Sequence, residues 1–169
     1  MVTTQLVSGN IGSKVRQAVK KANDTYLAEI NTTHFSPSAY NANQKAMLAL
    51  NFVLKFSQVV VYGGKGYTWG WEHWPRTFNT ITEINGSDKR VPAIEAFEAA
   101  ATAYQTGSVK LGATLNRAYK ALQTALQMGP EGDGCGDPLE LTTYKGKGYA
   151  IGESGDEKSP RVFVEIVSF

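Results

Sequence analysis

The first half of the chain carries helical and then extended patterns of hydrophobic residues. In residues 10–30, apolar side chains recur every three or four positions, which predicts an amphipathic helix with a basic early half. Ser36 before Pro37 is typical of a helix start, and residues 37–56 become apolar on nearly all sides. We therefore expect a second helix that is central to the core, followed by a short buried strand of β-branched residues at 57–62.

The second half repeats this order. An alternating stretch at residues 77–84 predicts a strand that ends at an Asn-Gly turn. Two helical patterns and then two extended segments follow, at residues 91–105, 108–127, 139–152 and 161–169. The predicted fold is α+β, with four main helices packed on a small, mainly antiparallel sheet, and a duplication into two similar helix-helix-strand halves is a further hypothesis. No linker divides the chain, so residues 1–169 are expected to form a single globular domain.

One motif occurs twice, about half the chain length apart. Residues 62–70 read YGGKGYTWG and residues 144–152 read YKGKGYAIG. Glycine adopts positive φ at little cost and tyrosines can pack across a strand pair, so the simplest interpretation is a structural turn used twice. The alternative is a surface that contacts nucleic acid.

That alternative depends on a short sequence match. Lys147-Gly148-Tyr149-Ala150 matches the first four positions of the RNP1 signature of RNA-recognition motifs, in which a lysine contacts phosphate and an aromatic ring stacks on a base. The following positions do not match, and the predicted element order differs from that fold. The match therefore implies no family.

An aromatic segment follows the first copy of the motif. Its three tryptophans lie within six positions, and if the segment is extended, Trp69 and Trp71 share one face. Such a surface suits contacts with protein, carbohydrate or stacked bases, and core packing is the alternative. The candidate binding residues of the chain are Tyr62, Lys65, Tyr67, Trp69, Trp71, Trp74, Arg76, Tyr144, Lys147 and Tyr149.

Catalytic and metal-binding patterns are weak. Cys135 with His73 or His34 could form a nucleophile and base, but neither histidine has a recognisable flanking signature. One cysteine and two dispersed histidines lack zinc spacing, and the glycine-rich acidic loop at 131–140 departs from a calcium loop at its fifth and twelfth positions. We therefore expect no catalytic residues, no metal and no cofactor.

Composition changes the picture in one respect. Charged residues make up only 19% of the chain, and the net charge is +2. A surface with little charge favours association. No secretory signal or apolar run long enough for a membrane span is seen, which predicts a cytoplasmic or virion location.

The predicted function is a non-catalytic, self-assembling structural protein, such as a viral or phage coat-type subunit with weak RNA or DNA contact. The alternatives are a small RNA- or carbohydrate-binding module, or a toxin-like nuclease acting near Tyr62, Lys65, His73 and Arg76.

Overall fold

The computed structural model describes residues 11–70, 74–106, 112–127, 140–151 and 160–169. It is an α+β fold with four helices in two pairs and two four-stranded sheets, so the predicted fold class and the order of two similar halves are confirmed. The described residues form two compact units. The first unit falls in Gln5–Asn79 with Phe163–Phe169, and the second falls in Thr80–Val162. The expectation of a single domain stays a prediction.

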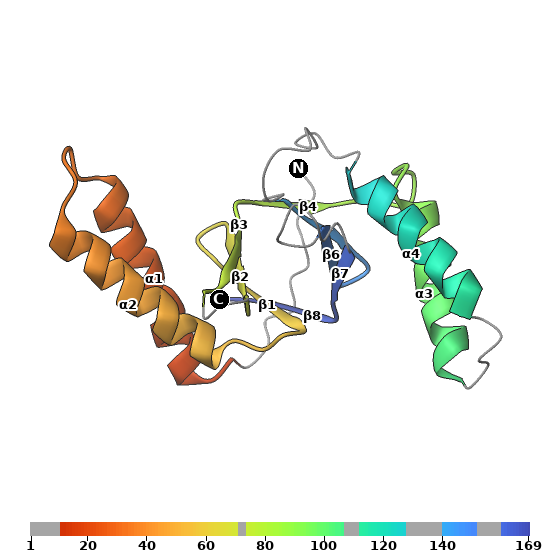
Figure 1. The fold of residues 1–169 in the computed structure, drawn as a ribbon, viewed down its shortest axis with the longest axis horizontal. Coiled ribbons are helices and arrows are strands. Elements are labelled where there is room, and N and C mark those ends of the chain that lie inside the picture. The colour runs from red at the N-terminus through yellow and green to blue at the C-terminus, as the bar shows by residue number, and fades with distance from the viewer. Residues whose placement is uncertain (1–10, 71–73, 107–111, 128–139, 152–159) are drawn as a thin grey trace. The chain divides into compact units, whose positions relative to one another are not determined.

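The first unit pairs helices α1 (Ser13–Ile30) and α2 (Pro37–Val53), which run side by side in Figure 1. Ser36 is the N-cap of α2, as predicted, because its Oγ accepts a hydrogen bond of 3.3 Å from the Ala39 amide. The strand order of its sheet is β3-β2-β1-β8, from Arg76–Phe78, Lys65–Thr68, Gln58–Tyr62 and Glu165–Ser168. β1 is antiparallel to β2 and parallel to β8.

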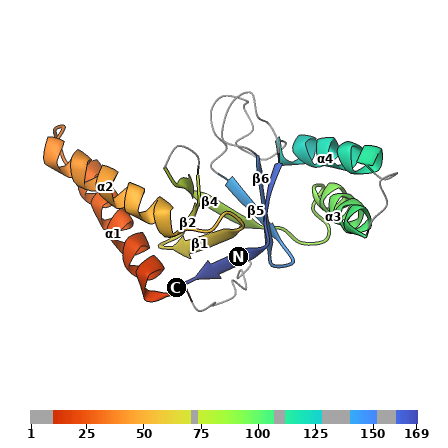
Figure 2. The same ribbon diagram turned by 60° about the horizontal axis from the view of Figure 1, so that its bottom comes forward.

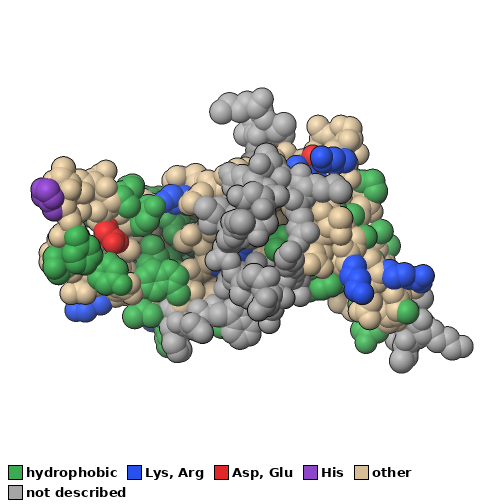
Figure 3. All heavy atoms as spheres, turned by 45° about the horizontal axis from the view of Figure 1, so that its top comes forward, with side chains coloured by type: hydrophobic (Ala, Val, Ile, Leu, Met, Phe, Trp, Pro, Cys, Tyr) green, Lys and Arg blue, Asp and Glu red, His purple; other side chains and the backbone are tan. Residues whose placement is uncertain are grey.

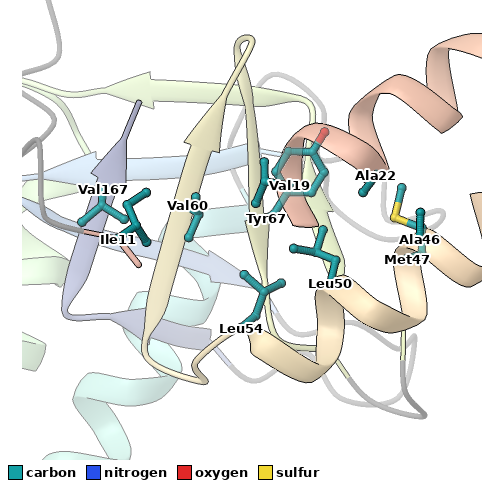
Figure 4. Close-up of a cluster of buried hydrophobic side chains, with 10 residues drawn as sticks. All are labelled: Ile11, Val19, Ala22, Ala46, Met47, Leu50, Leu54, Val60, Tyr67 and Val167. Carbon is teal, nitrogen blue, oxygen red and sulfur yellow. The ribbon is translucent and has the colours of Figure 1, made fainter. Parts of the chain in front are cut away.

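The core of the first unit lies between this helix pair and the sheet. Figure 4 shows Val19 and Ala22 of α1 and Leu50 of α2 gathered near Tyr67 of β2. All four side chains are buried. The expectation that the second helix is central to the core holds for only one of its faces, because Met47 and Leu50 are buried whereas Leu48 and Phe52 are exposed. A helix against one side of a sheet buries only one stripe.

The second unit repeats the plan with α3 (Val91–Gln105) and α4 (Gly112–Gln127), which Figure 2 shows next to each other. Its strand order is β4-β5-β6-β7, from Thr80–Glu83, Glu140–Tyr144, Lys147–Ile151 and Pro160–Phe163. β4 is parallel to β5, and β5 is antiparallel to β6. Its core joins Ile84, Val91, Ile94, Leu122, Tyr144 and Tyr149.

Two extended segments each change sheet partway along. β3 and β4 are separated by Asn79 alone and belong to different sheets, and β7 and β8 are separated in the same way by Val164. The sequence pattern predicted one strand in each place, because alternation of side chains does not reveal which neighbour a strand pairs with. Each half therefore contributes its last strand to the sheet of the other half.

Candidate functional site

The first copy of the motif forms the hairpin between β1 and β2. Tyr62 is paired with Lys65 at its end, and Gly63 and Gly64 fill the turn with φ of 59° and 81°. Gly66 has another role, since a Cβ there would lie 3.0 Å from Val59 Cγ1. The turn thus needs its first two glycines for backbone conformation and its third for close packing.

Basic and aromatic side chains gather around this hairpin. The Lys65 Nζ lies 3.8 Å from the centroid of the Tyr26 ring on α1. Tyr62 stacks on Phe169 with ring centroids 4.9 Å apart and planes inclined by 20°. Two more cations, both on α1, lie over the Phe169 ring. The Arg16 Cζ is 5.5 Å and the Lys20 Nζ is 5.9 Å from the ring centroid. We call these residues the basic–aromatic cluster: Arg16, Lys20, Tyr26, Tyr62, Lys65 and Phe169.

Among the described residues, no side chain neutralises the positive charge of this cluster. Within the described part of the chain, no carboxylate lies within ion-pair distance of Arg16, Lys20 or Lys65. Aromatic faces attract cations without cancelling their charge. Partial burial lowers the pKa of Lys65, as expected for an ammonium group that loses water and gains no anion.

The second copy has the same hairpin but the opposite electrostatic surroundings. Lys147 donates to Glu98 at 3.0 Å, and Lys145 lies 3.6 Å from Glu95. The tyrosines of the motif bind the same two carboxylates, with Tyr144 donating to Glu95 at 2.7 Å and Tyr149 donating to Glu98 at 2.6 Å. Burial and then the bond to Glu98 raise the pKa of Tyr149. Both lysines of this copy are therefore neutralised by α3.

Helix positions in the two copies can be matched through the hydrogen bonds of their buried tyrosines. Tyr67 donates a hydrogen bond of 3.2 Å to Asn23 of α1, where Tyr149 donates to Glu98 of α3. Counting three residues back along each helix matches Lys20 with Glu95. At equivalent positions, the first unit thus has lysine and asparagine where the second has two glutamates.

The predicted binding residues do not form one site. Tyr62 and Lys65 meet in the basic–aromatic cluster, and Tyr67 and Tyr149 are buried beneath their hairpins. Tyr144 and Lys147 are bound to α3. Arg76 is buried, with its guanidinium 4.9 Å from the Phe78 ring. Whether any of them binds a ligand stays a prediction.

The tryptophans also have separate environments. Trp69 is half-buried and meets Phe56 edge-on at 5.6 Å, while Trp74 is exposed. Asn51 of α2 fixes the start of the segment, because its Oδ1 accepts a 2.9 Å hydrogen bond from the Gly70 amide. Trp71 and His73 lie outside the described residues.

Sequence reasoning missed six residues of the two sites: Arg16, Lys20, Tyr26, Phe169, Glu95 and Glu98. The basic early half of the first helix was a signal for two of them, and Glu95 and Glu98 share a helix face because they are three residues apart. Their proximity to the hairpins depends on how each helix packs on its sheet. No periodicity in the sequence specifies that.

Evidence for catalysis or metal binding does not emerge from the described residues. No group of three or more His, Cys, Asp or Glu side chains in these ranges could hold a metal ion. Cys135 and the acidic loop around it lie outside them. Arg90, which binds Asp88 at 3.0 Å and Glu140 at 3.5 Å, joins the start of α3 to β5 and is explained as a structural ion pair. None of the helices in these ranges is long and apolar enough to cross a membrane.

Comparison of the chain with protein-family models, with characterised proteins and with solved structures finds no match.

Proposed function

We propose that the protein is a non-catalytic structural subunit that associates with copies of itself through the outer face of α2. The observation that carries this proposal is the exposure of Phe52, which is 91% accessible. Burial of a phenylalanine side chain stabilises by roughly 1.5–3 kcal/mol. A surface that leaves such a side chain in water gains considerably when another molecule covers it.

Phe52 belongs to a continuous apolar face. Leu48 lies one helical turn before it and Phe56 follows the end of the helix, with exposures of 45% and 56%. Figure 3 shows hydrophobic side chains exposed over the α1–α2 pair. We call Leu48, Phe52 and Phe56 the α2 apolar face. Exposed apolar patches of this kind mark interaction sites in many proteins.

The chemistry of this face favours a second copy of the chain as its partner. Residues 37–56 contain two charged residues, Lys45 and Lys55, and no acidic residue, so the face has no carboxylate that would select a basic partner. The net charge of +2 on 169 residues means that copies repel one another only weakly. An apolar face can also pair with itself about a two-fold axis.

The second unit supplies a comparison. Among its described residues, only Tyr104 is an exposed large hydrophobic side chain, at 47%. It lies near the end of α3, and none of its neighbours on that helix is both large and exposed. Association through apolar contact is therefore assigned to the first unit.

Sedimentation velocity over a concentration series tests the proposal. The wild type should form dimers or larger species, and Phe52→Ser should weaken association by about 2 kcal/mol, or about 30-fold in the dissociation constant. Tyr104→Ser is the matched control and should leave association unchanged. A wild type that stays monomeric at high concentration, or equal losses in both variants, contradicts the proposal. Electron microscopy of the wild type would show whether association continues into particles or filaments, as a coat-type subunit requires.

A further inference from the structure

The basic–aromatic cluster differs from its counterpart in the second unit by charge and not by backbone. Both hairpins have the same motif and equivalent pairing, Tyr62 with Lys65 and Tyr144 with Lys147. In the second, Glu95 and Glu98 bind the lysines and tyrosines. The second hairpin forms with carboxylates next to its lysines. The hairpin itself therefore does not require that the cations of the first copy have no carboxylate partner.

The cations of the first unit are arranged so that they remain available to an anion. Arg16 and Lys20 are exposed on α1, and all three cations of the cluster lie over aromatic rings. Asp24, the acidic residue of α1 nearest to them in sequence, is beyond ion-pair distance of each. Glu29 is turned to α2, where it accepts a hydrogen bond of 2.7 Å from Asn43.

We infer that the basic–aromatic cluster binds a strand of single-stranded nucleic acid, and that the second copy of the motif does not. Arg16, Lys20 and Lys65 would contact successive phosphates. Tyr62 and Phe169 stack on each other, and the cations lie over the Phe169 and Tyr26 rings. All three rings are only half-buried, and the parts that stay exposed would contact bases in sequence-tolerant binding. Basic side chains combined with aromatic rings favour a single strand, because the bases of a duplex are stacked on each other and closed to such rings.

The tests use fluorescence anisotropy of a labelled oligouridylate at low salt, with the full-length protein. Arg16→Gln/Lys20→Gln/Lys65→Gln should weaken binding by at least about 30-fold and reduce the salt slope of log affinity by about 2, because each single-strand phosphate contact contributes about 0.7. The matched control, Lys145→Gln/Lys147→Gln, should change neither quantity measurably. Melting temperatures confirm that both variants are folded.

A gain of binding provides the second arm. Glu95→Lys/Glu98→Asn gives the second copy the equivalents of Lys20 and Asn23, removes both carboxylates and keeps a hydrogen-bond acceptor for Tyr149. It should tighten binding by about threefold or more. The inference is overturned if the wild type does not bind the oligouridylate at low salt. It is equally overturned if the triple variant of the first copy and the double variant of the second lose the same binding affinity. It is also overturned if a duplex of the same length, or polyglutamate, binds as tightly as the single strand. These readouts are independent of association through α2, so either proposal can fail alone.

Discussion

Lys145 occupies a backbone conformation that the first copy of the motif gives to glycine. Its φ is 49°, and the equivalent Gly63 has φ of 59°. A side chain in this region clashes with the following carbonyl, which costs roughly 1–2 kcal/mol. The second hairpin therefore retains strain that the first avoids.

Lys145→Gly should raise the urea midpoint of unfolding, because it removes this strain. The ion pair that is lost with Glu95 is largely exposed and contributes little. Gly63→Ala is the matched change in the first copy and should lower stability by about 1 kcal/mol. A lower midpoint for Lys145→Gly would show that its contact with Glu95 outweighs the strain.

Of the glycines in the first copy of the motif, Gly63 and Gly64 have positive φ and Gly66 does not. Gly66→Ala should nevertheless destabilise by about 1–3 kcal/mol, because its Cβ would press on Val59 and on Phe78, 3.3 Å away. Chemical denaturation measures the effect. A double variant with Val59→Ala should recover part of the loss if crowding is the cause, and no recovery would point to the backbone.

The raised pKa of Tyr67 should make the folded state less stable at alkaline pH. Burial, followed by the nearby Tyr26 and Tyr62, raises its pKa to about 12, whereas an unfolded tyrosine titrates near pH 10. The folded state keeps a proton that the unfolded state loses, so stability is complete below about pH 10 and falls as the pH rises toward 12. Between about pH 9 and 11, the wild type should lose more stability than Tyr67→Phe. Parallel losses in the two proteins would assign the effect to other groups.

At the scale of elements, the first helix of each pair provides a hydrogen-bond acceptor for the buried tyrosine of its sheet. Glu98 of α3 accepts from Tyr149 and Lys147, and Asn23 of α1 accepts from Tyr67. Glu98→Ala should destabilise by roughly 1–3 kcal/mol, because it leaves the Tyr149 hydroxyl without this partner. Asn23→Ala should cost less, since a neutral acceptor is weaker than a carboxylate. Chemical denaturation of both variants measures the two losses in unfolding free energy. A larger loss for Asn23→Ala than for Glu98→Ala would contradict this prediction.

The helices were predictable because their patterns are local. The range 91–105 and the start at Pro37 agree with α3 and α2. The exposure of Phe52 was not predictable, since residues 46–56 are apolar on nearly all sides and no period shows which face meets the sheet. The cluster was predicted only at Tyr62 and Lys65, because its other members approach them through packing of α1 and β8.

For the whole molecule, the important feature is that the first unit includes β8, the last described strand in the sequence. β8 pairs with β1 in parallel, and its Ile166 and Val167 are buried. The second unit takes all four strands of its sheet from residues 80–163. Long-range pairing of this kind cannot be read from alternation, which is why the sequence predicted one sheet where there are two.

Fragments should therefore behave unequally. A chain of residues 80–163 should show cooperative unfolding, whereas residues 5–79 should not fold until a peptide of residues 163–169 is added in trans. Circular dichroism and hydrogen exchange measure both. If residues 5–79 are as protected alone as with the peptide, β8 is dispensable for the first unit.

The two segments whose strands belong to different sheets, residues 76–83 and 160–168, suggest how a duplicated chain of this kind could have arisen. Each half gives its final strand away and receives one in return. A polypeptide with a single half could complete its sheet only by trading that strand with an identical molecule, which is a domain-swapped homodimer. Gene fusion of two such protomers yields the present strand order without any rearrangement. A chain of this origin could carry Glu95 and Glu98 on one helix and Lys20 and Asn23 on the other.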